Sequence, residues 1–420
     1  MSDVTKPLFL DETGERIADG IARQNFLLTQ LITAQEGATP IQTLNEIAEI
    51  VRRGDAPNVF SIGDQINIKW NNGTSDYIIP FDIVHFDDVE LQDGETVPGM
   101  FIQSHYAFEG VQFDQNEGFY VVPDGGMAAG TYHFSMANSW GSNVVAGKSY
   151  QFTLTESYAK GDILQLGTAS SETSGLPDTA PANWRVRTYK ASGSTPAGSV
   201  ANATEILTLT EGTDGTDLGS LSSSTLYGTS GINNMQRSAY GYNRWSQSAI
   251  RQWMNSDGAA NAWFTPQNPY DRRPDQLASL RGMKAGFDEA FLNILKPVKV
   301  TTALNTVTDT QIGASESTYD MFFLASLEQE YVSPQASGVE GSAWLYWKRR
   351  LASTSPQGQG TTNPNHIRYA YNARTSAQYC RLRSAHRGVA SYAWNVGTSG
   401  LVNYYGAPSA YRAVPACVIC

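Results

Sequence analysis

Residues 58–157 alternate apolar and polar side chains, and this period of two is the strongest constraint on the fold. Ile66, Ile68 and Trp70, for example, are separated by single polar residues, as in strands whose successive side chains point to opposite faces of a sheet. Turn pairs such as Asn72-Gly73 interrupt the runs. The pattern predicts a β-sandwich or a β-barrel domain over this stretch.

A helical pattern precedes this domain. Within residues 11–34, apolar side chains recur at the spacing of a helix seam, with Gln24 as its one polar member: Ile17, Ile21, Leu28 and Leu31. A second helix is predicted over residues 41–53, ending at Gly54. Two heptads are too few for a stable isolated coiled coil, so residues 1–57 are predicted either to cap the next domain or to mediate oligomerisation or docking.

The remaining residues, 158–420, are rich in turns and are predicted to form a third domain of strands joined by long loops. One short helix is expected to begin at Ser246 and to bury a single apolar face: Ala249, Ile250, Trp253 and Met254. Gly (38) and Tyr (21) are plentiful and charged residues make up only 16%, which favours strands and turns over helices. The predicted class is therefore α+β and rich in β-structure.

Charge and hydropathy exclude some classes of protein. The net charge of −11 and the sequence pI near 5.0 argue against a general nucleic-acid binder, which needs a basic surface. No window approaches the roughly eighteen apolar residues of a membrane span, and the first residues lack the pattern of a secretory signal. We therefore expect neither membrane insertion nor export by the signal route.

No catalytic motif is evident, neither a phosphate-binding loop nor a zinc-binding H-E-x-x-H, and we expect neither an enzyme nor a cofactor. His85, His105 and His133 lie in the alternating region together with Glu117. The alternatives are a metal site and ordinary strand histidines. Because each histidine precedes an aromatic residue and no His-x-His pair occurs, we expect no metal.

All three cysteines, Cys380, Cys417 and Cys420, lie near the end of the sequence. Their number and spacing match neither a secreted disulfide framework nor a zinc site with four ligands. Buried free thiols are the first expectation, and a Cys380–Cys417 bridge is the alternative. Cys380 and His386 are close in sequence, but we do not expect a catalytic thiolate–imidazole pair.

The stretch 379–420 mixes Tyr, Ser, Gly and Asn in no periodic order. Adaptable binding surfaces use this mixture, because Tyr supplies rigid contact area and the small residues supply flexible hydrogen bonds. Between these positions lie pieces that resemble framework, such as Trp394 and RAVPAC at 412–417. The arginines of this stretch are predicted to hold turns by bonding carbonyl oxygens, with an anion site as the alternative: Arg381, Arg383, Arg387 and Arg412.

Residues 242–420 resemble the C-type-lectin-like domains of phage and bacterial proteins, which share their fold with formylglycine-generating-type domains. The resemblance rests on NRWSQSAIRQWMNS, YDMFFLASLEQEY and the closing RAVPACVI. The stretch 379–420 resembles more specifically the variable region of proteins diversified by retroelements, in which adenine-directed mutagenesis rewrites Asn codons. Such codons cannot become Lys, Glu, Gln or Met codons when they end in a pyrimidine, and none of these four residues occurs in that stretch.

In that family the variable positions line one ligand-binding face. Carried over to this chain, the resemblance implies the following candidate positions: Tyr379, His386, Val389, Ser391, Tyr392, Asn395, Gly397, Leu401, Asn403, Tyr404, Tyr405, Gly406, Pro408, Ser409 and Tyr411. The stretch has no Glu-Pro-Asn or Gln-Pro-Asp triplet of the calcium-dependent lectins. We therefore expect recognition through tyrosines and polar loops, without a bound metal.

The resemblance implies a receptor-binding structural protein of a phage particle, such as a head or tail fibre, which is assembled in the host cytoplasm and carried in the virion. Its partners would be a host-surface protein or glycan, other virion proteins bound through the N-terminal region, and further copies of itself, with a trimer as first expectation. Repetition on a particle would raise the avidity. The alternatives are a virion decoration protein without diversification, and a formylglycine-type enzyme, which requires a reactive cysteine pair.

Overall fold

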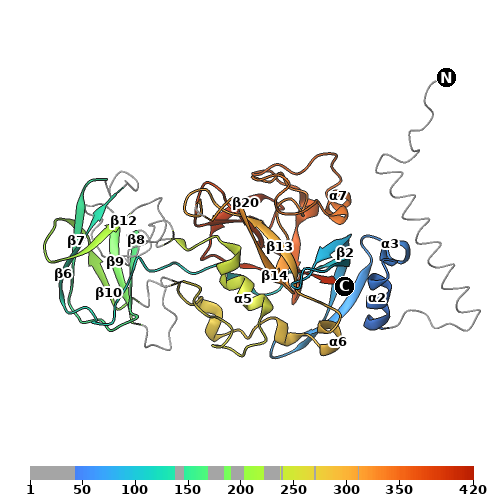
Figure 1. The fold of residues 1–420 in the computed structure, drawn as a ribbon, viewed down its shortest axis with the longest axis horizontal. Helices are drawn as coiled ribbons and strands as arrows, with labels where there is room; N and C mark the ends of the chain where they lie inside the picture. Colours follow the sequence, from blue (N-terminus) through green and yellow to red (C-terminus); the bar gives the residue numbers. More distant parts are fainter. Residues whose placement is uncertain are drawn as a thin grey trace, which may run out of the picture.

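The computed structural model describes residues 43–137, 146–168, 184–190, 203–221, 237, 240–268, 271–310 and 312–420. The helix predicted over residues 11–34 lies outside these ranges. The described chain forms two units (Figure 1). We call residues 43–116 and 237–420 the body, and residues 117–221, which are inserted into it, the sandwich.

The first sheet of the body joins strands from both ends of the described chain. Its order is β1 (Gln65–Asn71), β2 (Asp76–Glu90), β3 (Thr96–Ser104), β22 (Pro415–Ile419) and β15 (Phe323–Leu324). Strand β22 runs antiparallel to β3, with Cys417 opposite Ile102. The body therefore closes only when residues more than three hundred positions apart in the sequence come together.

The second sheet of the body carries most of the candidate positions. Its order is β20 (Val402–Gly406), β19 (Tyr392–Val396), β18 (Cys380–Ala385), β21 (Ala410–Arg412) and β4 (Gly110–Gln112). Two hairpins flank the sheets: β13 (Val298–Ala303) with β14 (Ser315–Asp320), and β16 (Arg368–Ala370) with β17 (Ala373–Gln378). Short helices complete the body: α2 (Leu44–Arg52), α3 (Ala56–Val59), α5 (Ala249–Asn255), α6 (Glu289–Leu292) and α7 (Leu345–Arg350).

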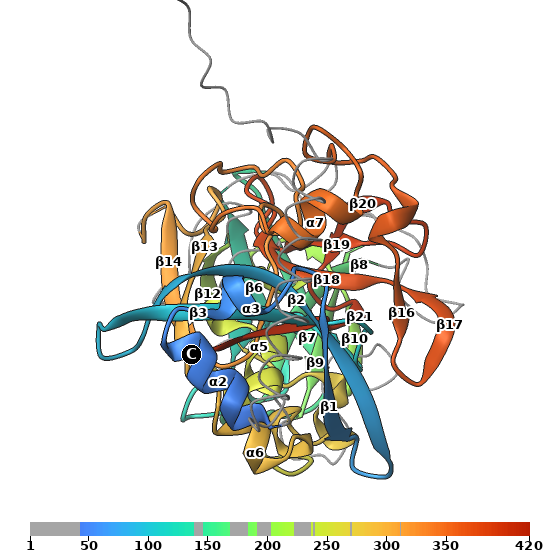
Figure 2. The same cartoon turned by 90° about the vertical axis from the view of Figure 1, so that its right-hand side faces the viewer.

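Helix α2 confirms the helix predicted over residues 41–53. A capping box begins it, in which Glu46 N donates to Thr43 Oγ1 at 3.3 Å and Thr43 N donates to Glu46 Oε2 at 2.9 Å. Gly54 follows the helix with φ +76°, a conformation that favours glycine. Figure 2 looks onto this helix, which packs against β3 and α6. This part of the N-terminal region therefore caps the body.

Helix α5 begins two residues later than predicted. Ser248, and not Ser246, is its N-cap, because residues Trp245–Gln247 form a turn of 3₁₀ helix (η3) before it. The hydroxyl of Ser248 accepts a hydrogen bond from Arg251 N at 3.3 Å. The predicted apolar face is confirmed, since all four of its residues are buried: Ala249, Ile250, Trp253 and Met254.

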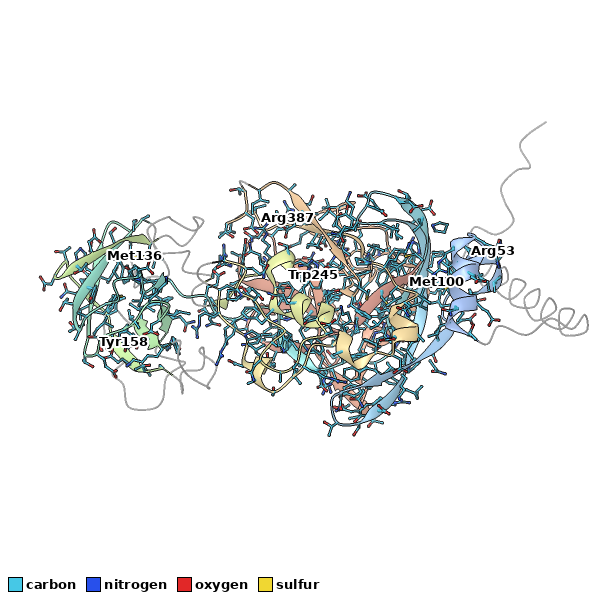
Figure 3. All side chains as sticks on the ribbon, turned by 60° about the horizontal axis from the view of Figure 1, so that its bottom comes forward. Arg53, Met100, Met136, Tyr158, Trp245 and Arg387 are labelled. Carbon is cyan, nitrogen blue, oxygen red and sulfur yellow. The ribbon has the colours of Figure 1, made fainter. Side chains whose placement is uncertain are left out.

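The sandwich consists of two four-stranded sheets around one apolar core. One sheet has the order β10 (Glu205–Thr208), β9 (Trp184–Tyr189), β8 (Ile163–Thr168) and β5 (Tyr120–Val121). The other has the order β11 (Thr210–Glu211), β7 (Ser149–Leu154), β6 (Gly130–Met136) and β12 (Thr216–Leu221). Phe134 and Tyr150 of one sheet pack with Leu164 and Val186 of the other. Figure 3 places Met136 and Tyr158 in this unit, and Met100 and Trp245 in the body.

The class predicted from the sequence, α+β and rich in β-structure, is confirmed, but the predicted domain boundaries are wrong. Residues 58–157 do not form one unit, because β1 to β3 belong to the sheet that contains β22, whereas β5 to β7 belong to the sandwich. The break at 157/158 falls inside the sandwich, between β7 and β8. None of the sheets in the described ranges closes into a barrel. A period of two predicts strands, but it carries no information about which strands share a sheet.

Candidate ligand-binding surface

The structure leaves most candidate positions exposed or half-buried, but it buries three of them. Ser391 and Asn395 have no exposed surface, and Gly397 is also buried. Asn395 lies on β19, which runs inside the sheet between β18 and β20, and Ser391 and Gly397 flank this strand directly. These three candidate positions therefore do not lie on the free surface. Tyr379, Tyr404 and Tyr405 are the most exposed tyrosines among the candidate positions, at 39%, 38% and 41%.

The candidate positions are not all on one face, because the two faces of edge strand β20 divide them. In the register of β19 and β20, Tyr404 lies opposite Trp394 and Tyr405 lies opposite Ala393. Successive residues of a strand point to opposite faces of its sheet. The neighbouring exposed tyrosines therefore belong to two separate aromatic groups.

The first group, which we call the tyrosine trio, comprises Tyr379, Tyr405 and Tyr411. The rings of Tyr379 and Tyr411 are stacked with centroids 4.9 Å apart. Tyr405 meets both edge-on, at 6.3 Å from Tyr379 and 5.5 Å from Tyr411. The guanidinium of Arg381 lies 4.7 Å from the centroid of Tyr411, a cation–π contact that holds this ring in place.

The second group, the aromatic quartet, comprises His386, Tyr392, Trp394 and Tyr404. His386 stacks on Trp394 at 5.6 Å and meets Tyr404 at 4.5 Å. Tyr392 stacks on Tyr404 at 5.4 Å. Trp394, which was predicted to be framework, is buried and packs against a small core behind the sheet: Leu327, Val332, Leu382, Val396 and Val402. Burial lowers the pKa of His386, so its ring is predominantly neutral at neutral pH.

Arg381 supports the candidate positions through the main chain. It is buried on β18, and its two terminal nitrogens donate four hydrogen bonds, all to carbonyl oxygens: those of Ala393 at 3.0 Å, Tyr405 at 3.1 Å, Gly406 at 2.5 Å and Ser409 at 3.1 Å. Burial lowers the pKa of Arg381 to about 9. Carbonyl oxygens are present in every residue type, so this support does not depend on which side chains stand at these positions.

The prediction that the arginines hold turns through carbonyl oxygens is confirmed. Arg383 donates to Leu324 O at 2.9 Å and to Glu340 O at 2.7 Å, and Arg412 donates to Phe108 O at 2.7 Å. Arg387 makes a longer contact of this kind with Ala314 O, at 3.5 Å. These bonds join the stretch 379–420 to the rest of the body.

Asn243 organises the loop over residues 386–392, a role that the sequence reasoning missed. Its side-chain amide nitrogen lies within 3.1 Å of three carbonyl oxygens, those of His386, Val389 and Tyr392. Its amide oxygen accepts a hydrogen bond from Asn305 Nδ2 at 3.1 Å, which fixes the orientation of the amide. Gln357 supports the next turn in the same way, donating to Gly400 O at 3.0 Å. The three carbonyl partners of the Asn243 amide nitrogen lie more than 140 positions away in the sequence, so no local pattern predicts this role.

Some polar atoms at the candidate positions are buried without a hydrogen-bond partner. They are Ser391 Oγ, His386 Nδ1 and both polar atoms of the Asn395 side chain. Such atoms usually destabilise a fold by roughly 1–3 kcal/mol each.

The cysteines are unreactive. All three are free and buried, which confirms the predicted free thiols and excludes the alternative Cys380–Cys417 bridge. Burial raises the pKa of Cys380 to about 12 and that of Cys417 well above its usual value, so neither is a thiolate at neutral pH. Cys380 begins β18 and His386 follows its end, which places them about 20 Å apart along a strand.

The histidines considered for a metal site lie apart, each with its own partner. His85 Nε2 lies 3.2 Å from Ser342 Oγ, His105 Nδ1 lies 2.9 Å from Asp82 Oδ2, and His133 Nε2 lies 3.6 Å from Asp217 Oδ1. Glu117 instead forms a buried ion pair with Arg237, with both bonds at 2.8 Å. Within the described ranges, no three His, Cys, Asp or Glu residues are grouped to hold a metal ion.

A separate cavity of about 320 Å³ lies between β2, β13 and the loop over residues 338–342. His85, Phe101 and Trp344 contribute to its wall. At its rim, Lys299 Nζ pairs with Glu90 Oε2 at 2.8 Å. None of the candidate positions lines this cavity, although Arg383 contributes to its wall.

Comparison with known proteins adds a family without an assigned role. Residues 221–419 match a family described as a domain of unknown function (DUF6273). No curated protein and no solved structure matches the chain. The matched stretch begins at the last residue of β12 and runs to the end of β22. In the part of the chain that the structure describes, no helix is long and apolar enough to cross a membrane.

Proposed function

We propose that residues 379–411 form a diversified binding surface on a C-type-lectin-like scaffold, and that the protein is a receptor-binding component of a phage particle. The observation that carries this proposal is the support of the surface through main-chain carbonyls by Arg381, Asn243 and Gln357. A scaffold of this kind keeps its shape while the side chains change. The exposed tyrosines supply contact area for a host-surface protein or glycan.

The enzyme alternative receives no support from the cysteines. A formylglycine-type oxidase needs a reactive cysteine pair, whereas Cys417 has no exposed surface and burial raises its pKa. In the decoration-protein alternative the stretch is not diversified and does not bind a ligand. The test of this alternative is therefore a binding measurement.

The test replaces Tyr404, Tyr405 and Tyr411 together by Ala. Because these side chains lie at the surface or half-buried, we expect the melting temperature to fall by only a few degrees. Attachment to a panel of bacterial cells, measured with the labelled protein by flow cytometry, should fall at least tenfold. The control is Tyr369→Ala, which removes a similarly exposed tyrosine on β16 that is not one of the candidate positions.

Two outcomes would contradict the proposal. If the triple variant fails to fold, the tyrosines belong to the core and the surface is wrongly placed. If it folds and attaches as strongly as the unmodified chain, the stretch 379–411 is not the binding surface. A location in the virion is tested separately, by mass spectrometry of purified particles.

A further inference from the structure

Three unsatisfied polar atoms lie together beneath the tyrosine trio. Asn395 has no exposed surface, and neither its amide oxygen nor its amide nitrogen has a hydrogen-bond partner. The Nε of Arg381 is also buried and unpartnered, although the terminal nitrogens of the same side chain are bonded. Arg381 and Asn395 are opposite each other in the β18–β19 register, so the three atoms belong to neighbouring side chains on one face of the sheet.

The tyrosine trio occupies the same face. Asn403 lies opposite Asn395 on β20, and Tyr405 is two residues further along that strand, so Tyr405 shares the face of Asn395. Gly397 directly follows β19, two residues beyond Asn395, and the ring of Tyr379 covers it: a Cβ at Gly397 would lie 3.3 Å from Tyr379 Cε1. Asn395 therefore lies below the space between the rings of Tyr379 and Tyr405.

These two rings form a movable cover. Their centroids are 6.3 Å apart and the rings are nearly perpendicular, at 81°. Both side chains are about two-fifths exposed, and within the described ranges no hydrogen bond holds either hydroxyl. Exposed side chains change rotamer within nanoseconds. Rotation of either ring would open a path from solvent to Asn395.

The hydrogen-bonding groups of Asn395 and Arg381 determine which ligand this site can bind. The Asn395 amide offers an N–H donor and an oxygen acceptor, and Arg381 Nε–H adds a second donor. The carbonyl oxygen of an acetamido or peptide group complements the two donors, because it accepts from Asn395 Nδ2 and Arg381 Nε. The N–H of the same trans amide points away from its carbonyl, so Asn395 Oδ1 accepts instead from an N–H or O–H of a neighbouring ligand group. The flat faces of the amide and its methyl or methylene group suit contact with tyrosine rings.

We propose that Asn395 and Arg381 form an amide-binding subsite under the tyrosine trio, which recognises an acetamido group of an amino sugar or a peptide amide. This inference rests on the proposed function. It names the chemical group that the displayed surface would bind. The two sources share one chemistry, and the probes below distinguish them.

The test uses the full chain and three probes: the trimer of N-acetylglucosamine, cellotriose, which carries hydroxyls in place of the acetamido groups, and acetyl-Ala-Ala-amide. Saturation-transfer NMR should show contact with the acetyl methyl of the sugar trimer or of the peptide, and none with cellotriose. The amide probe with the stronger transfer identifies the source. The side-chain amide signals of Asn395 should shift when that probe is added.

Asn395→Leu keeps the size of the side chain and removes its polar atoms. We expect this variant to melt at the same or a higher temperature and to bind the amide probe at least tenfold more weakly. Tyr369→Ala, which lies outside the subsite, should bind the probe as the unmodified chain does. Should Asn395→Leu fail to fold, the probe experiments on the unmodified chain decide the question alone.

The proposal is overturned if neither amide probe shows transfer and the Asn395 signals do not move, or if Asn395→Leu binds the probe normally. The experiments distinguish failure of the amide-subsite proposal from failure of the proposed function. Loss of cell attachment in the triple tyrosine variant, together with no amide binding, would leave the display surface standing without this subsite. Normal attachment of that variant would remove the surface itself.

Discussion

The guanidinium of Arg381 is buried and donates all four of its hydrogen bonds to carbonyl oxygens of the stretch that it supports. In Arg381→Ala these oxygens would lose their donors inside the protein. We expect the free energy of unfolding to fall by at least about 3 kcal/mol, measured by urea denaturation. Arg381→Lys should recover only a small part of it, because an ammonium group cannot reproduce the planar fork.

The control for Arg381 is Arg374→Ala. Arg374 is exposed on β17 and donates to Ile78 O at 3.0 Å. Its loss should lower the free energy of unfolding by less than about 1 kcal/mol. If the free energy of unfolding falls equally in the two alanine variants, the stability of the stretch 379–420 does not depend on Arg381.

Asp271 makes the stability of the body depend on pH. Burial raises its pKa to about 8, and the carboxylate of Glu117 acts in the same direction. The pKa of Asp in an unfolded chain is about 3.9. The folded state therefore binds a proton that the unfolded state releases between these values, so the contribution to stability is complete at low pH and is lost as the pH rises towards 8.

We therefore expect the melting temperature to decrease from pH 5 to pH 9, as followed by scanning fluorimetry. Asp114 lies in the same cluster, and burial raises its pKa as well, with Asp271 and Glu117 as neighbouring charges. Asp271→Asn removes one titrating group and should flatten the decrease. Parallel curves for the variant and the unmodified chain would contradict this assignment.

Residue roles were predictable where a residue type has few stable options. An arginine in a turn-rich stretch that has no acidic residue can be satisfied by carbonyl oxygens, and all four arginines proved to bond them. The role of Asn243 and the burial of Asn395 could not be predicted. Asn243 acts through partners far away in the sequence, and burial of Asn395 depends on the register of β19.

At the scale of elements, strand β20 changes the expected surface. Tyr404 and Tyr405 are neighbours in the sequence and suggest one continuous patch, yet they oppose Trp394 and Ala393 and so point to opposite faces. Hydrogen bonds to main-chain carbonyls hold both ends of β20. Gly360 N donates to Val402 O at 2.9 Å, and the Arg381 side chain donates to Gly406 O. A strand held in this way presents side chains on both of its faces.

A library of variants tests whether the main-chain support, and not the exposed side chains, determines the fold of the stretch 379–420. Randomising the exposed and half-buried candidate positions should leave most variants folded, because their support comes through carbonyl oxygens. Randomising Arg381, Asn243, Gln357 and Trp394 should unfold most variants. Resistance to protease of variants displayed on yeast measures the folded fraction. If this fraction falls equally in the two libraries, the side chains at the candidate positions themselves stabilise the stretch 379–420.

At the scale of the whole molecule, the two chain crossings into the sandwich lie side by side. Glu117 N donates to Arg237 O at 3.1 Å, and the cores of the body and the sandwich share no residues. A chain in which a short Gly-Ser linker replaces residues 118–236 should therefore fold. It loses the contact of Arg272 with the ring of Tyr189, 4.3 Å away, and we expect about 1 kcal/mol less stability from this contact.

The contrasting chain is the stretch that matches the family, residues 221–419 alone. It lacks β1 to β4, so β22 has no β3 beside it and β21 has no β4. We expect this piece to remain unfolded by circular dichroism and calorimetry. A cooperative transition in this piece, or none in the linker variant, would contradict the division into body and sandwich. The division itself was not predictable from the sequence, because strands of both units share the same period of two.

The position of β22 has a consequence for synthesis of the chain. In the sequence this strand follows all the candidate positions, and in the finished sheet it lies between β3 and β15. A chain that stops at a nonsense codon within residues 379–411, or leaves the reading frame there, cannot place β22 beside β3. Only copies translated in frame through residues 379–411 complete this sheet, so folding itself separates intact chains from interrupted ones.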